Sequence, residues 1–361
     1  MSEKRSTKSL FLIGIMVISF LTPILSPASA DEQADSEPEG YDATGIIIGD
    51  LADFNPAEGR EYLLIDENTP VVSAYGFMKQ AWIDSGRPGV QDMKYEPVTH
   101  TRANGRVCTP HLTGDTLTVP ISGGSIDAYV AKTTNTVAFI VQSGRTLSST
   151  VLNNLASSWD STIYPTMTTY YGKDYGDGRG LAAPDIDNNC QVQIIVYDID
   201  GAFNTGGYFA PSFASVRESV FIDFADITLN WGKSIIAHEL QHLLHNAQDP
   251  YENLWIDEGN ADVAIYLCFG PDSTLVSHLN QWTEAPELSI RWWNQRFADY
   301  GAGFIFTMYL ADHLGGGPAV RQLVQDSATG GVSVQNLALS PPSGSSGAIG
   351  RTMGEIFANF S

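Results

Sequence analysis

The chain has 361 residues, of which 43% are apolar and 17% are charged, a balance typical of a globular protein rather than a disordered or collagen-like one. Its 41 acidic residues outnumber 19 basic ones, which gives a net charge of −22. Nucleic acids and anionic membrane surfaces both attract clustered Lys and Arg, so this composition argues against either partner. We interpret the dispersed negative charge as serving solubility.

Residues 1–30 have the pattern of a cleaved export signal. A basic start precedes the apolar stretch from Leu10 to Leu25, and Ala28-Ser29-Ala30 forms a small-residue cleavage site. A membrane anchor is the alternative, but the apolar stretch is short for a bilayer span of about 20 residues. The sequence therefore predicts a secreted, extracellular protein that begins at Asp31 and has no membrane contact once the signal is removed.

Residues 31–106 carry no motif that identifies a chemistry. The segment 31–40 holds five acidic residues and no basic one, as expected of a solvated linker. Residues 44–106 alternate short apolar runs with Gly and Pro. We interpret 31–106 as an acidic linker and N-terminal region, either a propeptide or an N-terminal decoration, and 107–361 as one domain.

From residue 107 onward the pattern predicts strands first and helices later. β-Branched residues between glycine-bearing turns predict strands at 117–119, 137–141, 191–197 and 219–224. Apolar residues at helical spacing predict helices at 147–160, 231–247, 256–268 and 301–314. This order indicates an α+β fold rather than a βαβ alternation. Another helix begins after Thr352 and looks unfinished at the last residue, as in a truncated product.

Asp185, Asp187 and Asn189 alternate as oxygen ligands do in a calcium loop. Two features differ from such a loop, because Cys190 stands where the glycine of the sharp turn is needed and Val196 stands where the bidentate glutamate should be. The alternative is an Asx-rich turn before a strand. We favour the turn and keep Ca²⁺ as a candidate cation.

Three cysteines, Cys108, Cys190 and Cys268, lie beyond the export signal. An oxidising destination permits one disulfide and leaves one thiol. Their wide spacing matches no metal motif, and the sequence does not select the pair that forms.

His238-Glu-Leu-Gln-His242 carries the strongest chemical signal in the sequence. Residues four apart on an α-helix face the same way, so His238 and His242 can present two nitrogens to one tetrahedral zinc ion. Glu239 is the predicted catalytic base, because its carboxylate can take a proton from a zinc-bound water. The alternative is a pair of solvated helix histidines near a surface glutamate. His245 shares their face, but three successive turns cannot converge on one ion, so we expect it to lie behind the site or at the helix C-terminus.

A hydrolytic zinc site needs a third protein ligand and leaves the fourth position to water. Glu258 lies 16 residues past His242, which leaves room for a turn and a second helix antiparallel to the first. We expect Glu258 to complete the site. Asp262, one helical turn later, is placed to hydrogen-bond the far nitrogen of His238 and fix its tautomer.

The pattern His-Glu-x-x-His followed by Trp-x-x-Glu-Gly resembles the gluzincin metallopeptidases, in which that glutamate is the third zinc ligand. It is most similar to the hyicolysin-like neutral metalloproteases, because Asp185-Ile-Asp187 leads into an apolar strand, and Gly207-Tyr-Phe209 and a strand at 220–223 precede the zinc helix. The likeness extends over residues 107–361. It implies a zincin-like domain with a mixed sheet, an edge strand followed by the active-site helix, and a mainly helical C-terminal part.

The resemblance implies a secreted endopeptidase that holds one Zn²⁺ per chain and hydrolyses peptide or protein substrates. The aminopeptidase branch carries a Gly-x-Met-Glu-Asn stretch that grips a substrate amino terminus, and its absence here favours cleavage within chains. The strand at 219–224 is then the expected sheet edge that binds substrate by strand addition. Two alternatives stay open: a zinc aminopeptidase or other amide hydrolase, and a non-catalytic secreted binding protein.

A further catalytic residue follows from the same resemblance. The stretch 299–315 is similar to a helix of the gluzincin aminopeptidases, where a tyrosine three residues before a glycine donates to the tetrahedral intermediate. Tyr300 and Gly303 match that spacing, so Tyr300 is predicted to donate to the developing oxyanion. The alternative is a ring packed at the start of a helix.

Overall fold

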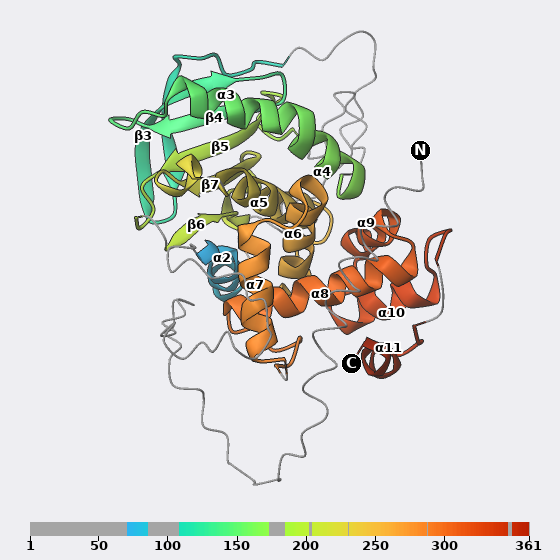
Figure 1. Cartoon of the computed structure of the whole chain (residues 1–361). Helices are drawn as coiled ribbons and strands as arrows, with labels where there is room; N and C mark the ends of the chain where they lie inside the picture. Colours follow the sequence, from blue (N-terminus) through green and yellow to red (C-terminus); the bar gives the residue numbers. More distant parts are fainter. Residues whose placement is uncertain are drawn as a thin grey trace, which may run out of the picture. The chain divides into compact units, whose positions relative to one another are not determined.

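The computed structural model describes residues 71–85, 108–172, 185–201, 204–229, 231–286, 288–345 and 349–360 (Figure 1). The predicted export signal at 1–30 and most of the region 31–106 lie outside these residues. The described part contains a mixed sheet and a mainly helical C-terminal part, which agrees with the predicted α+β class.

One seven-stranded sheet runs in the order β1-β6-β7-β5-β4-β3-β2. Its strands are β1 (Val71–Ser73), β2 (Thr116–Ile121), β3 (Gly124–Thr133), β4 (Val137–Gln142), β5 (Val192–Tyr197), β6 (Thr205–Tyr208) and β7 (Ser219–Asp223). β4, β5 and β7 are parallel, β2 and β3 extend them as antiparallel hairpins, and β6 is antiparallel to β7. β1 pairs parallel to β6. The four predicted strands correspond to β2, β4, β5 and β7.

The prediction that 219–224 forms the edge of the sheet is wrong. β7 lies between β5, to which it is parallel, and β6, to which it is antiparallel. All five of its residues are buried, as expected of a strand covered on both sides. β6 adds to the side of β7 that the sequence left open, and β1 in turn covers the outer side of β6.

Most helices follow the last strand, but α2 lies between β1 and β2, and α3 and α4 lie between β4 and β5. The helices are α2 (Tyr75–Asp84), α3 (Ser149–Ser158), α4 (Tyr164–Tyr170), α5 (Gly232–Asn246), α6 (Leu254–Phe269), α7 (Ser273–Glu284), α8 (Phe297–Leu314), α9 (Gly317–Gln325), α10 (Gly331–Leu339) and α11 (Met353–Phe360). The helices predicted between residues 147 and 314 correspond to α3, α5, α6 and α8, and the helix predicted after Thr352 corresponds to α11. A single π-helical turn joins α3 to α4. The Ser148 and Asp272 side chains cap α3 and α7 by accepting backbone N–H groups.

Apolar side chains cover both faces of the sheet. The larger core joins one face to α3, α4, α5, α6 and α8. A smaller cluster on the other face includes Val130, Ile195 and Phe221, with Met78 of α2 packed against it. Figure 1 shows α3 and α4 beside β4 and β5, and α6, α7 and α8 beyond α5. α5 therefore packs against the sheet on one side and against α6 on the other.

Close helix contacts depend on three glycines. A Cβ atom on Gly259 of α6 would lie 2.6 Å from the carbonyl oxygen of Gly303 on α8, and one on Gly301 would overlap the backbone of His278 on α7. Because any larger residue would separate these helices, the glycines allow side chains of α6, α7 and α8 to meet beside α5. Tyr300 is thereby brought close to His278.

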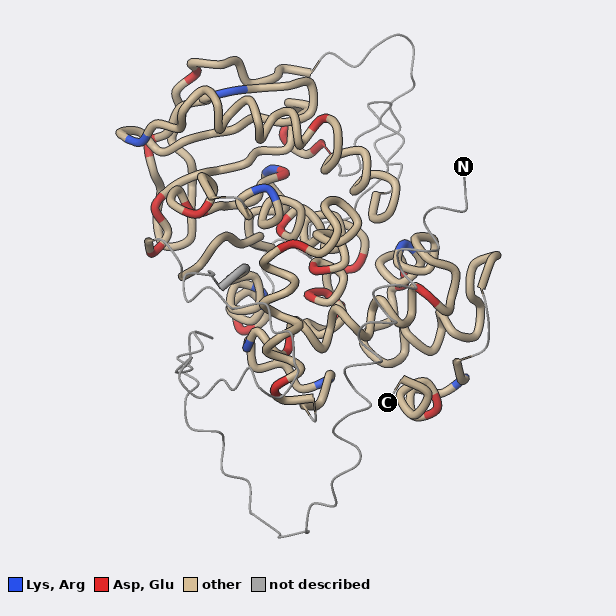
Figure 2. The backbone as a smooth tube through the Cα atoms, in the orientation of Figure 1, with Lys and Arg blue, Asp and Glu red and all other residues tan. Residues whose placement is uncertain are grey.

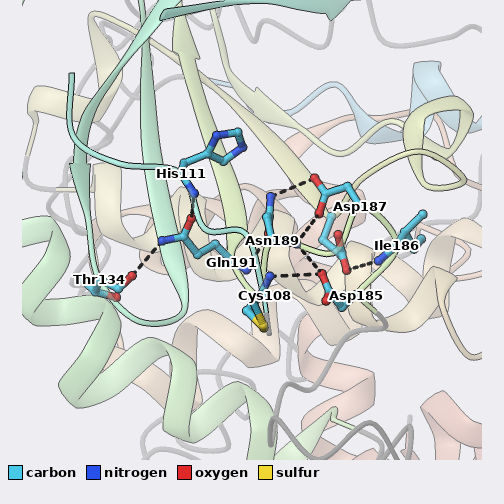
Figure 3. The surroundings of a disulfide bond; sticks show 10 residues. Cys108, His111, Thr134, Asp185, Ile186, Asp187, Asn189 and Gln191 are labelled. Atoms are coloured by element: carbon cyan, nitrogen blue, oxygen red, sulfur yellow. Dashed lines mark hydrogen bonds between the residues drawn. A yellow bond between two sulfur atoms is a disulfide. The ribbon is translucent and has the colours of Figure 1, made fainter. Parts of the chain in front are cut away.

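Cys108 and Cys190 form a disulfide, and Cys268 is a half-buried free thiol. The bond attaches the segment before β2 to the loop before β5, where Asp185, Asp187 and Asn189 gather next to it (Figure 3). Asp185 Oδ1 accepts the backbone N–H groups of Asn189 and Cys190 at 3.0 and 3.2 Å. These are the bonds of an Asx-rich turn.

Acidic residues are spread along the strands and helices, and basic residues are few (Figure 2). None of the helices in the described ranges combines the length and the apolar run that a membrane span requires.

Candidate metal centre

The antiparallel helices α5 and α6 bring His238, His242 and Glu258 together. Glu258 Oε2 lies 3.0 Å from His238 Nε2 and 3.2 Å from His242 Nε2. All three side chains have zero exposure. His242 Nε2 and Glu258 Oε1 have no hydrogen-bond partner in the described part of the chain. Because buried polar atoms are normally satisfied, two imidazole nitrogens and a carboxylate that converge in this way fit a cation such as Zn²⁺.

The other nitrogen of His238 faces Asp262. His238 Nδ1 lies 3.1 Å from Asp262 Oδ1, and Asp262 Oδ2 lies 2.7 Å from His278 Nδ1 on α7. Asp262 therefore bridges two buried histidines. Such a bond directs the Nε2 lone pair of His238 towards Glu258 when the Nδ1 carries the proton.

Asp257 occupies the equivalent position behind His242. Its Oδ1 lies 3.1 Å from His242 Nδ1 and 2.9 Å from His245 Nδ1. Its Oδ2 accepts from the Tyr75 hydroxyl and from Lys79 Nζ, each at 2.7 Å. The two candidate histidine ligands are therefore each held from behind by a carboxylate, and His245 lies behind the site.

Charge pairing dominates the protonation of this cluster. Burial lowers the pKa of His238, but Asp262 and Glu258 outweigh burial and raise the pKa to about 10. Burial raises the pKa of Asp262, but His278 and His238 outweigh burial and lower the pKa to about 2. The pKa of Glu258 is also lowered, because His242 and His238 offset its burial. This pairing keeps the carboxylates ionised and His238 protonated, and a bound metal cation would take the place of the Nε2 proton.

Glu239 also lies at the centre, with zero exposure. Burial raises its pKa to about 7, Glu258 adds to the rise, and His238 and His242 oppose it. Neither carboxylate oxygen has a hydrogen bond of ordinary length within the described residues, although the Ser73 hydroxyl is close enough to lower the pKa. A carboxylate with a pKa near neutrality and a free oxygen is suited to exchange a proton.

Tyr300, on the first turn of α8, borders the same cluster. Its ring centroid lies 6.0 Å from that of His238 and 4.8 Å from that of His278. Its hydroxyl donates to the backbone carbonyl of Ser73 at 3.2 Å. Tyr300 is therefore a hydrogen-bond donor to a peptide carbonyl beside the candidate metal ligands.

Sequence reasoning missed five residues of this centre. Asp257 lies directly before Glu258 on α6, and the others lie outside the two motifs in sequence: Ser73, Tyr75, Lys79 and His278. A signal existed for Asp257, because it precedes the third ligand on the helix that faces His242 and His245. No comparable pattern marks Ser73, Tyr75 or Lys79, since their positions depend on the pairing of β1 with β6.

A second group of acids lies at the start of β5 and β7, and of its members Glu218 is buried while Asp185 is half-buried and Asp187 is exposed. Ligand atoms of Asp185, Asp187 and Glu218 lie within 4.8 Å of one another. Burial, with a contribution from Asp187, raises the pKa of Glu218 to about 9. Glu218 was not among the predicted calcium ligands, because it follows Asp187 by 31 residues and meets the loop only through strand pairing.

No family model matches the chain. Over 215 residues the chain is 24% identical to the neutral metalloprotease ShpI of Staphylococcus hyicus, an alignment that covers 51% of this chain and 47% of that protein. The chain thus spans about half the length of this relative. The similarity supports a distant relationship to a metalloprotease.

Proposed function

We propose that this protein is a secreted, zinc-dependent endopeptidase of the gluzincin type with a zincin-like domain. The observation that carries the proposal is the convergence of His238 Nε2, His242 Nε2 and Glu258 Oε2 beside the carboxylate of Glu239. The distant likeness to a neutral metalloprotease supports the same class of reaction. Export is supported by the signal-like pattern at 1–30.

His238, His242 and Glu258 would hold one zinc ion, with Asp262 and Asp257 orienting the two imidazoles. When bound, zinc supplies a Lewis acid that polarises the substrate carbonyl and lowers the pKa of water. The histidines must be neutral to bind it, so Asp262 and Asp257 act by fixing their Nδ1 protons and presenting Nε2.

Glu239 is the proposed general base, which accepts a proton from the attacking water. Its pKa of about 7 leaves the ionised form well populated at neutral pH while keeping it a useful proton acceptor. Tyr300 is the proposed oxyanion donor. Its pKa is raised well above the usual value, chiefly by burial and then by Glu258, so the hydroxyl keeps its proton and can donate.

The deciding experiment compares wild type with Glu239→Gln. The amide fills the same space but cannot accept a proton, so zinc content measured by mass spectrometry should stay near one per chain while casein hydrolysis falls about 10²–10⁴-fold. A chelator should abolish hydrolysis by wild type. Glu284→Gln, at an exposed position at the end of α7, is the matched control and should behave as wild type. Near wild-type hydrolysis by Glu239→Gln would refute the assigned mechanism.

A further inference from the structure

A short segment from the N-terminal region lies over the candidate metal centre. It consists of β1 and α2, residues 71–85, which precede the predicted domain at 107–361. Three of its side chains are buried at the centre, with exposures of 1% for Ser73, 0% for Tyr75 and 3% for Lys79. A buried lysine is unusual on any helix and requires a partner. The side chains of this segment are therefore part of the packing around the candidate metal centre.

The segment occupies a strand edge beside α5. Val71 and Ser73 of β1 pair with Thr205 and Gly207 of β6, and the backbone N–H of Ala74 donates to the carbonyl of Gly207 at 2.9 Å. Both β6 and β1 contact α5, which carries the two candidate histidine ligands. An extended peptide that binds by strand addition needs a free edge of this kind. β1 already uses the backbone groups of β6 that such a peptide would pair with.

Side chains of the segment also contact the catalytic candidates. The Tyr75 ring stacks on His242 with centroids 3.8 Å apart, and its hydroxyl and Lys79 Nζ both bind Asp257. The Ser73 carbonyl accepts the Tyr300 hydroxyl, and the Ser73 hydroxyl approaches Glu239. A peptide carbonyl of this chain therefore receives the hydrogen bond that the proposed function assigns to a substrate.

These contacts close the site. His238, Glu239, His242 and Glu258 all have zero exposure, and Tyr300 has 1%. A peptide bond cannot reach them while Ser73 and Tyr75 stay in place. Removal of the segment would leave the centre intact, since Asp257 would keep His242 and His245, and Asp262 would keep His238 and His278.

We propose that residues 71–85 are an autoinhibitory segment that occupies the substrate-binding edge of β6 and must be displaced before a peptide binds. This inference rests on the proposed peptidase function. The segment and a substrate peptide would bind in the same way. Each would pair an extended backbone with β6 and offer a backbone carbonyl to the Tyr300 hydroxyl. The Lys79–Asp257 ion pair and the Tyr75–His242 stack fix the segment in the closed position.

The test uses the full chain with Ala74→Pro, which removes the N–H that bonds to Gly207 and changes no side chain at the metal centre. Ala74→Ser keeps that N–H and is the matched control. Lys79→Met is a second variant, which deletes the ion pair and keeps the unbranched side chain up to its terminal atom. Each protein is measured for zinc content, for the rate at which a chelator extracts zinc, and for hydrolysis of unstructured casein. Thermal melting verifies that each variant is folded.

We expect Ala74→Pro and Lys79→Met to speed zinc extraction and casein hydrolysis at least tenfold, with Ala74→Ser unchanged. Extraction that speeds up while hydrolysis stays at or below the wild-type rate would make 71–85 a structural part of a working peptidase and overturn the inference. Unchanged extraction in both variants would overturn it as well, because the segment would not control access. Faster extraction with no hydrolysis by any protein would instead refute the peptidase function, and the inference with it.

Discussion

Two carboxylate clusters of this protein show opposite shifts in pKa. Around α5 and α6, cationic partners outweigh burial and lower the pKa values of three acids: Lys79 and then two histidines act on Asp257, and histidines act on Glu258 and Asp262. At the start of β5 and β7, burial dominates and raises the pKa values of Asp187 and Glu218. Burial alone therefore does not decide the charge of an acid, because the partners within hydrogen-bond distance decide it.

The two clusters also differ in the ligand atoms that they offer. The first offers imidazole nitrogens and carboxylate oxygens, and the second offers carboxylate oxygens alone. Imidazole and carboxylate together suit Zn²⁺, whereas oxygen ligands alone suit Ca²⁺. In the first cluster, each candidate histidine ligand is held by a second buried carboxylate. In the second, Asp187 accepts from the side-chain amides of Asn189 and Gln193, and Glu218 accepts one backbone N–H from Ile186. The following variants test whether the first cluster binds metal more strongly than the second.

The largest effect is expected from Glu258→Ala. Two imidazoles alone make a poor zinc site, so this variant should lose nearly all zinc during dialysis, as measured by mass spectrometry. Glu284→Ala, at an exposed position, is the control and should keep its zinc. If Glu258→Ala retained zinc while Asp262→Ala lost it, the roles assigned to the two acids would be exchanged.

A smaller effect is expected from Asp262→Ala. This change leaves all three candidate ligands but frees the ring of His238, so zinc affinity should fall about 10–100-fold, as is typical of groups that orient a ligand. Competition with a chromophoric chelator measures the dissociation constant. Asp257→Ala gives an independent comparison at His242 and should fall in the same range. An affinity equal to that of wild type in both variants would remove the orienting role.

Tyr300→Phe tests a neutral neighbour of the first cluster. The change removes one oxygen and keeps the ring, so kcat should fall at least tenfold while zinc content and KM change little. The Tyr300 hydroxyl also bonds to Ser73, so the comparison is best made in the Ala74→Pro background, where 71–85 is already loosened. An unchanged kcat there would leave Tyr300 as a packing residue of α8.

The sequence predicted the elements whose pattern is local. α5, α6 and α8 carry apolar residues at helical spacing. β4, β5 and β7 are buried along their whole length except for one end residue of β4. β6 was missed as a strand because its four residues include two glycines. α2 was missed because its buried positions are Tyr75, Gly76, Lys79 and Trp82, which do not form an apolar stripe.

The residues of the candidate site also fall into those that local spacing predicts and those that it does not. His238, His242 and Glu258 lie within two consecutive helices, so their spacing in the sequence was enough to predict that they meet. The structure brings them together. Ser73 and Tyr75 reach them only through the pairing of β1 with β6, a contact between residues more than 130 positions apart. Such pairing is fixed by the whole sheet, and no single segment encodes it.

The smallest effect, and the one that tests the second cluster, is expected from Glu218→Gln. Burial raises the pKa of Glu218 from an ordinary 4.5 to about 9, so the folded protein holds a proton that the unfolded chain has released at neutral pH. The stability from this proton is fully present below about pH 4.5 and is lost as the pH rises towards about 9. Gln is always neutral, so the difference in Tm between variant and wild type should grow in favour of Gln over that pH range. One unsatisfied buried group is worth roughly 1–3 kcal/mol, which corresponds to a shift of a few degrees. Melting curves at several pH values, first with Ca²⁺ chelated and then with Ca²⁺ added, provide the measurement.

If the cluster binds Ca²⁺, the added ion should stabilise wild type at pH 8 and leave Glu218→Gln nearly unchanged, because the amide brings no charge to the site. If Ca²⁺ changes neither protein, Asp185 and Asp187 serve only the Asx-rich turn, and the histidine-bearing cluster remains the one candidate metal centre of the two.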